Sequence, residues 1–190
     1  MIRKTPEVAP SVFRGFVRLA RFRSEGFAYF AGTHAAMLNS LAPLIAFPLV
    51  GGALLLIGGG GVGAASDLLA TVVALLAPLL IAHALALRWG REDAWLRYAA
   101  AFNWCQWALP VAAVFMLVAM GIIMRITGMP QNVAAMAFLA GLVGYGLALH
   151  YFLARNGLGL SVGRSVACVA AMNLGTGLLV LGPRLLTAGP

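Results

Sequence analysis

The sequence predicts an all-α integral membrane protein: a bundle of five transmembrane helices preceded by a basic amphipathic interfacial helix. Of the 190 residues, 62% are hydrophobic and only 9% are charged, whereas a soluble domain carries about 25% charged residues. The charged residues also separate apolar segments of the length, about 20 residues, that a helix needs to cross a bilayer. So few charges cannot cover a water-facing surface, so the apolar residues must face lipid or other spans.

The first predicted element is the interfacial helix, within residues 11–30. Its apolar face carries Phe13, Phe16, Val17 and Ala20, and its basic face carries Arg14, Arg18 and Arg21. Basic amphipathic helices lie flat on an anionic leaflet. We therefore expect these arginines, together with Arg23, to contact anionic lipid headgroups. The alternative is a charged tail that only sets the topology.

The five spans follow from the positions of the charges. No charged residue occurs from residue 26 to 66, which is too long for one helix, and the glycine run at 58–61 divides it. The expected spans are His34–Ile57, Asp67–Leu87, Tyr98–Met124, Asn132–Leu153 and Val162–Leu181. Asp67 is the expected N-cap of the second span. Helices are expected because lone strands leave backbone groups unsatisfied in lipid.

Proline occurs within the first three spans, at Pro43, Pro48, Pro78 and Pro110. Proline removes a backbone hydrogen bond and can kink a helix. Such kinks can open a cavity or act as hinges, although membrane helices also tolerate proline without a functional reason.

The basic residues predict the orientation. Eleven of the thirteen lie in the N-terminal tail, the connection between spans two and three, and the connection between spans four and five; only Arg125 and Arg184 lie on the other side. The positive-inside rule then places the N-terminus in the cytoplasm and the C-terminus on the far side of the membrane. The expected division is a cytoplasmic tail over residues 1–32, a five-span domain over 33–183 and a short outside tail over 184–190.

Polar residues at similar depth form a predicted band in the cytoplasmic half of the bundle. Its members are Asn39, His83, Asn103, Gln106 and His150. Polar side chains at membrane depth are costly to bury and usually face the bundle interior. Three interpretations remain open: a hydrogen-bonded core that fixes helix pairing, a binding or transport cavity, and a haem held by His83 and His150.

Small residues recur every four positions along the fifth span, at Gly159, Gly163, Ala167, Ala171 and Gly175. This spacing allows another helix to approach closely. The packing helix can belong to the same chain or to a second copy, so a homo-oligomer or another membrane protein is a candidate partner.

Enzymatic function is not expected. The five acidic residues all lie outside the middle of the spans. The segments 58–63 and 159–163 fit GxGxxG and GxSxG, but neither has the strand–turn–helix context that those motifs need. The basic residues lie at span ends, so nucleic acid is not an expected partner, and no metal or cofactor is predicted. Cys105 and Cys168 are expected to be buried free thiols.

Two segments carry a family resemblance. Residues 22–30, with the sequence FRSEGFAYF, precede a proline-bearing span, and residues 98–106, YAAAFNWCQ, open the third span. In these segments and in the order of its parts, the chain resembles bacterial Yip1-domain proteins. The resemblance implies a bacterial inner-membrane protein with a cytoplasmic N-terminal segment, five spans and a periplasmic C-terminus. The eukaryotic members of the family are linked to membrane traffic through partner binding rather than catalysis, and the bacterial members have no settled activity. The resemblance carries over no active-site residues.

Together these features predict a non-enzymatic inner-membrane protein of Yip1-like type that acts as a membrane adaptor or organiser through helix packing. The alternative is a small oligomeric transporter or channel that uses the polar band as its path. A water-accessible cavity at Asn103 and His150 favours transport, and a dry, fully paired band favours the adaptor.

Overall fold

The computed structural model describes residues 11–59 and 61–187, with the side chains of 184, 186 and 187 excepted. All regular structure in this part of the chain is helical. In chain order the elements are α1 (Val12–Ala20), the 3₁₀ helix η1 (Ser24–Tyr29), α2 (His34–Ile57), α3 (Gly61–Arg88), α4 (Glu92–Cys105), α5 (Ala108–Thr127), α6 (Gln131–Gly157) and α7 (Val162–Thr187).

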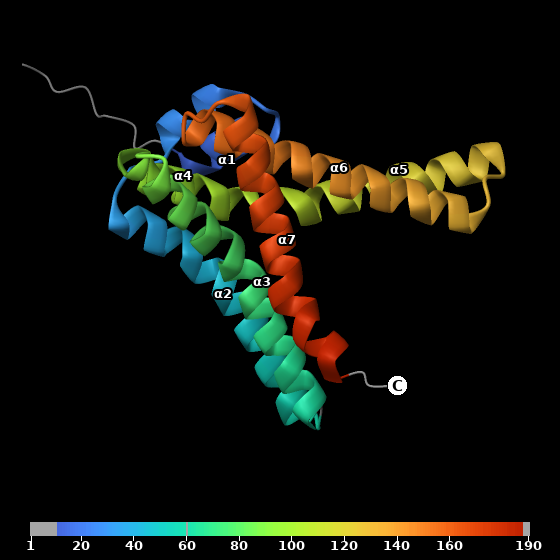
Figure 1. Cartoon of the computed structure of the whole chain (residues 1–190). Coiled ribbons are helices and arrows are strands. Elements are labelled where there is room, and N and C mark those ends of the chain that lie inside the picture. Colours follow the sequence, from blue (N-terminus) through green and yellow to red (C-terminus); the bar gives the residue numbers. More distant parts are fainter. Residues whose placement is uncertain (1–10, 60, 188–190) are drawn as a thin grey trace, which may run out of the picture.

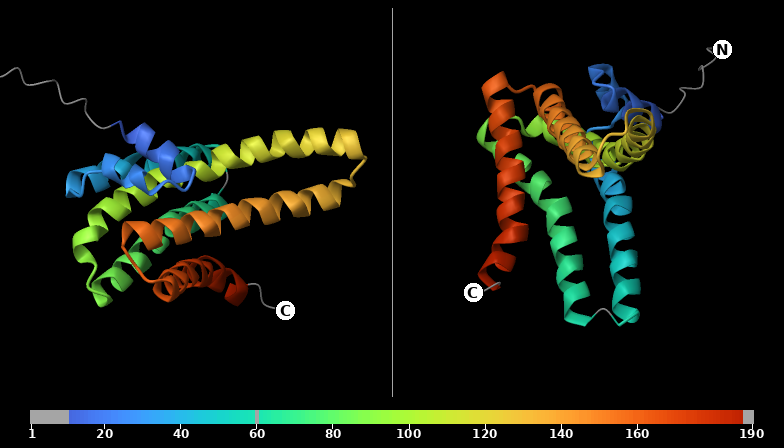
Figure 2. Two further views of the ribbon diagram at one scale, coloured as in Figure 1. Left: turned by 90° about the horizontal axis from the view of Figure 1, so that it is seen from above. Right: turned by 90° about the vertical axis from the view of Figure 1, so that its right-hand side faces the viewer.

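Five helical segments are long and apolar enough to cross a membrane: α2, α3, the combined segment Glu92–Thr127, α6 and α7. They form two arms that diverge from a common end (Figure 1). One arm contains α2, α3 and α7, and the other is the α5–α6 hairpin (Figure 2). The large apolar side chains along both arms are exposed, as expected for surfaces that face lipid. The predicted five-span all-α fold is therefore confirmed.

The two arms meet in a region that we call the junction. It consists of α1, η1, α4, the last turns of α3 and α6, and the first turns of α7, which together contain almost the whole buried core. Helix α4 lies at its centre, and every residue from Tyr98 to Asn103 is buried. Helix α4 is less hydrophobic overall than the spans. The stretch that is buried here is aromatic and alanine-rich, with the sequence YAAAFN. Alanine lets helices approach closely, and the aromatic rings fill the remaining space.

The third expected span is two helices. Helix α4 ends at Cys105 and α5 begins at Ala108, so the helix is interrupted at the residues between them. Pro110 contributes to the break, because its ring clashes with the carbonyl of residue 106 and it has no N–H to donate there. The amide of Leu109 instead bonds to the carbonyl of Gln106 in a tighter, i to i−3 turn.

The spans occupy the expected parts of the chain, but several of their ends are corrected. Helix α4 begins at Glu92, so Arg97 lies within it and not in the connection before it, and α6 ends at Gly157. Helix α2 has the expected bounds, but α3 begins at Gly61, so Asp67 lies in its second turn and cannot be its N-cap. Gly59 and Gly61 have φ values of 92° and 57°, which explains why glycine occupies the turn between α2 and α3. Helix α7 continues through Thr187, into the segment expected to be a tail. Residues 1–10 and 188–190 of the expected tails lie outside the described part of the chain.

The N-terminal segment forms a short helix packed on the bundle. Helix α1 has nine residues and ends before Phe22, whose φ is +58°. Gly15 of α1 and Gly26 of η1 allow the two elements to touch: a Cβ on Gly15 would lie 2.7 Å from the Tyr29 Cβ, and one on Gly26 would lie 2.8 Å from the Gly15 carbonyl oxygen. Phe27 and Phe30 enter the core instead of extending an amphipathic face.

Candidate functional site

A continuous row of aromatic rings crosses the junction. The ring of His83 on α3 lies 4.6 Å from that of Trp95, and Trp95, Tyr98 and Phe102 then follow one another along α4 at 5.8 and 5.7 Å between centroids. Phe102 in turn lies 5.0 Å from the imidazole of His150 on α6. Residues 95, 98 and 102 share one helical face, so the spacing in the sequence produces this row. The row ties α3 to α6 through α4.

Asn103 forms the polar contact between α4 and α2. Its side-chain nitrogen donates to the Ser40 hydroxyl at 3.0 Å, and that hydroxyl donates to the carbonyl of Met37 at 2.6 Å. Both side chains are buried, at 1% exposure each. The Asn103 Oδ1 atom is buried without a hydrogen-bond partner. A polar pair at this depth fixes which faces of α2 and α4 meet.

A polar cavity of about 190 Å³ lies between α3, the α4–α5 break, α6 and α7. Its lining includes Gln106, His150, Asn173 and Thr176. The Nδ1 atom of His150 and the hydroxyl of Thr176 are buried and have no hydrogen-bond partner. Unpartnered polar atoms beside a cavity of this size are suited to binding water or a small polar solute.

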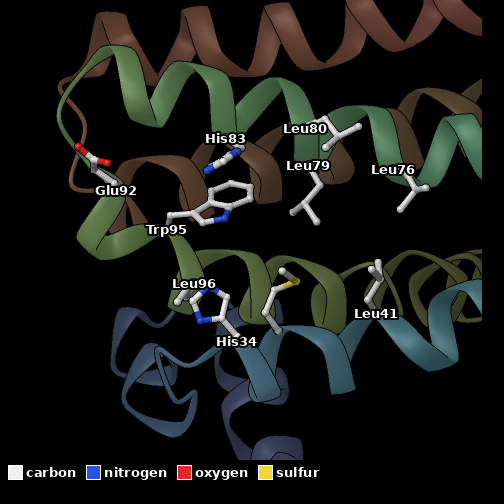
Figure 3. Close-up of a pocket in the computed structure, with 10 residues that line it drawn as sticks. His34, Leu41, Leu76, Leu79, Leu80, His83, Glu92, Trp95 and Leu96 are labelled. Atoms are coloured by element: carbon white, nitrogen blue, oxygen red, sulfur yellow. The ribbon is translucent and has the colours of Figure 1, made fainter.

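A larger cavity of about 530 Å³ lies between α2 and α3 and reaches the start of α4. Figure 3 shows His83 lying over the Trp95 ring, with Glu92 near the cavity's end and His34 on the opposite side. The remaining lining is mainly leucine, so this cavity is apolar apart from its histidines and one carboxylate.

The five residues of the predicted polar band fall in different places. Asn39 is exposed on α2, and the adjacent Ser40 makes the contact to Asn103 instead. Gln106 and His150 line the same polar cavity, whereas His83 lines the larger apolar one. Three aromatic rings separate His83 from His150, so the two imidazoles cannot ligate one haem iron.

The four arginines of the N-terminal segment gather around one surface cavity. Arg14, Arg18, Arg21 and Arg23 line a volume of about 390 Å³ together with Phe13 and Val17. The guanidinium carbon of Arg18 lies 5.0 Å from the centre of the Tyr29 ring, a cation–π contact that orients it. The predicted membrane-surface residues thus form one basic patch on α1 and the turn after it.

The small-residue pattern of the fifth span is only partly used for packing. Gly175 packs against α3, where a Cβ would lie 2.7 Å from Ile81 Cδ1. Gly159 precedes α7, at φ +61°, and Gly163 and Ala167 are exposed. Ala171 is half-buried. The buried face of α7 consists instead of Ser165, Cys168, Val169 and Met172.

The two cysteines are free and buried, as predicted. Cys168 donates to the Met172 sulfur at 3.7 Å, and the Tyr98 hydroxyl approaches the same sulfur at 3.9 Å. Within residues 11–59 and 61–187, no group of three His, Cys, Asp or Glu side chains could hold a metal ion.

The five apolar helices and their exposed apolar surfaces decide the class of protein. The chain is a multi-pass helical membrane protein. No protein-family model matches it, and comparison with curated proteins and with solved structures finds no match.

Sequence reasoning overlooked three residues of these sites: Ser40, Asn173 and Thr176. Each carries a polar group in an apolar helix, which is the signal that identified Asn103. Serine and threonine are common in membrane helices because their hydroxyls bond to the preceding turn, so they stand out less in a sequence. Ser40 shows this type of bond, from its hydroxyl to the Met37 carbonyl at 2.6 Å.

Proposed function

We propose that this chain is a non-enzymatic protein of the bacterial inner membrane that acts as an adaptor or organiser of the bilayer through helix packing. The order of its parts, an N-terminal segment followed by five spans, supports a Yip1-like type. The proposed orientation has the junction on the cytoplasmic side. Of the thirteen basic residues, six belong to the N-terminal segment, and five lie in or between the helical turns that meet at the junction: Arg88, Arg91, Arg97, Arg155 and Arg164. This distribution accords with the positive-inside rule.

The observation that carries this proposal is the fixed position of α1. Leu19 is completely buried in the core, and the Tyr145 hydroxyl on α6 donates to the Ala20 carbonyl at 2.9 Å. The arginines of the basic patch are therefore held at one place on the bundle. A rigid basic surface at the edge of a leaflet attracts anionic lipids, at about 1 kcal/mol per basic residue.

Lateral clustering of anionic lipid tests the proposal. In proteoliposomes that contain self-quenching fluorescent phosphatidylglycerol, the wild-type chain should increase the quenching. The variant R14Q/R18Q/R21Q/R23Q should lose most of this increase. Arg125→Gln, at an exposed position in the last turn of α5, is the matched control and should behave like wild type. Equal quenching by the wild-type chain and the fourfold variant would rule out this role of the patch.

The polar cavity favours a second candidate function, a small oligomeric transporter or channel. Its support is the pair of unpartnered buried atoms, His150 Nδ1 and Thr176 Oγ1, on the wall of that cavity. Histidine can relay protons within a membrane. Proteoliposomes with a trapped pH-sensitive dye and an imposed potassium diffusion potential test this candidate. Proton entry that exceeds that of empty vesicles and disappears in His150→Phe supports it, and entry equal to that of empty vesicles excludes proton transport.

A further inference from the structure

The basic patch opens into an apolar groove. The groove has a volume of about 400 Å³ and runs between α1, α5 and α6, with walls that include Phe16, Ala20, Val111, Phe115, Met116 and Tyr145. Val17 and Arg21 line both this groove and the arginine cavity. A charged compartment and an apolar compartment thus adjoin each other at two shared residues.

We propose that the two compartments form a single binding site for one anionic glycerophospholipid, whose phosphate lies among the arginines and whose acyl chain lies in the groove. The inference deepens the proposed function and rests on it, because it gives the basic patch a specific ligand. A glycerophospholipid joins a phosphate to long apolar chains, so its phosphate would meet the arginines while one chain enters the adjoining groove. The bilayer supplies such lipids at high local concentration.

The headgroup part follows from charge complementarity. Four arginines line the cavity, and arginine binds phosphate oxygens with paired N–H donors. The stacking of Arg18 on Tyr29 reduces the ordering that binding would require.

The acyl-chain part follows from the course of α5. The groove begins beside Ala20 of α1, at the junction, and follows α5 from Ala108 to Met116. From the junction α5 leads along its arm (Figure 2), so a chain that starts among the arginines and follows the groove would run beside a membrane-spanning helix. A lipid in a bilayer already has this arrangement, with its phosphate at the leaflet surface and its acyl chains within the leaflet.

The groove is also preformed. The Tyr145 hydroxyl holds the end of α1 to α6, and the ring of Phe22 lies edge-on to those of Tyr145 and Phe152, at 5.8 and 5.6 Å. These contacts fix the separation between α1 and the α5–α6 hairpin at the mouth of the groove. A site whose walls do not need to be ordered loses less free energy on binding.

Lipid retention by the purified full-length chain tests the inference. The chain is delipidated in detergent and titrated with phosphatidylglycerol, with phosphatidylcholine of the same acyl chains, and with glycerol phosphate, and native mass spectrometry counts the bound molecules. Retention of one phosphatidylglycerol, with much weaker retention of the other two, is expected. Arg21→Gln should weaken the binding about five-fold.

A second variant probes the groove. Ala112→Trp places a large ring in it and should weaken binding about ten-fold, because excluding even two methylene groups from an apolar site costs this much. Val111→Phe, at an exposed side chain, replaces it if Ala112→Trp does not fold. The matched controls are Arg125→Gln and Ala135→Trp, at exposed positions away from the site, and both should bind like wild type.

Three results would overturn the inference. They are equal lipid retention by the wild type and the groove variants, equal retention of phosphatidylcholine and phosphatidylglycerol, or binding of glycerol phosphate as tight as that of phosphatidylglycerol. The clustering assay separates this failure from failure of the proposed function. If lipid clustering depends on the arginines but lipid retention is unchanged in the groove variants, the two-part site is rejected and the organiser function is kept. Absence of clustering by the wild-type chain rejects the function itself.

Discussion

The hydroxyl of Tyr145 on α6 donates a 2.9 Å hydrogen bond to the backbone carbonyl of Ala20, the last residue of α1. This carbonyl belongs to the free end of a helix, where intrahelical donors are lacking. The bond therefore satisfies a group that the helix cannot satisfy itself, and it joins segments 125 positions apart in the chain. It is one of the contacts that make α1 part of the bundle.

Removing that hydroxyl should loosen α1. Tyr145→Phe leaves the ring packing intact and removes about 1 kcal/mol of stability, the typical net value of one such bond. Hydrogen exchange of the α1 amides in detergent should become faster while that of α4 stays unchanged. Tyr151→Phe on the same helix is the matched control. Unchanged exchange in α1 would show that the bond does not hold the helix in place.

Close approach of α1 and η1 requires glycine at position 15. A Cβ there would lie 2.7 Å from the Tyr29 Cβ and 2.8 Å from the Phe30 ring, so Gly15→Ala should destabilise the junction by about 1–3 kcal/mol. Gly144→Ala is the control, because a Cβ at that position meets no atom within 4 Å. A thermal melt of both variants distinguishes them, and equal midpoints would contradict the packing described for the junction.

The Asn103–Ser40 hydrogen bond should contribute measurably to pairing of α2 with α4. A double-mutant cycle with Asn103→Leu and Ser40→Ala should give a coupling free energy of about 0.6–1 kcal/mol, as found for bonds between membrane helices. Reversible unfolding in mixed micelles provides the four stabilities. If the two substitutions are additive, the contact does not stabilise the pair.

Much of the fold could be read from the sequence because lipid imposes a simple requirement. Charged residues and the glycine run at 58–61 mark the ends of the spans, and α2 begins and ends at the expected residues. The α4–α5 break was harder to predict. Pro110 lies at this break, but the other prolines, within α2 and α3, leave those helices continuous. Whether proline bends or divides a helix depends on its tertiary contacts.

The polar band is predicted only from the depth of its residues in the membrane. That depth does not show which way each side chain points around its helix axis. Asn39 and Ser40 differ in depth by only about 1.5 Å, but they point about 100° apart around the helix axis. Ser40 consequently faces Asn103, and Asn39 is exposed. His83 and His150 likewise lie at the two ends of one aromatic row and line separate cavities. The hydropathy of an apolar span contains no periodic signal strong enough to identify these faces.

The location of α1 in the membrane tests the central claim most directly. Nitroxide labels at Phe13→Cys and Arg23→Cys, in a chain whose Cys105 and Cys168 are replaced by serine, report oxygen and nickel-chelate accessibility in anionic nanodiscs. Phe13 is 70% exposed on α1, so its label should contact lipid and oxygen, while the label at 23 should remain accessible to the chelate. Both spectra should show restricted motion. Two mobile labels that are freely accessible to the chelate would contradict the account, because α1 would then be a tail in water.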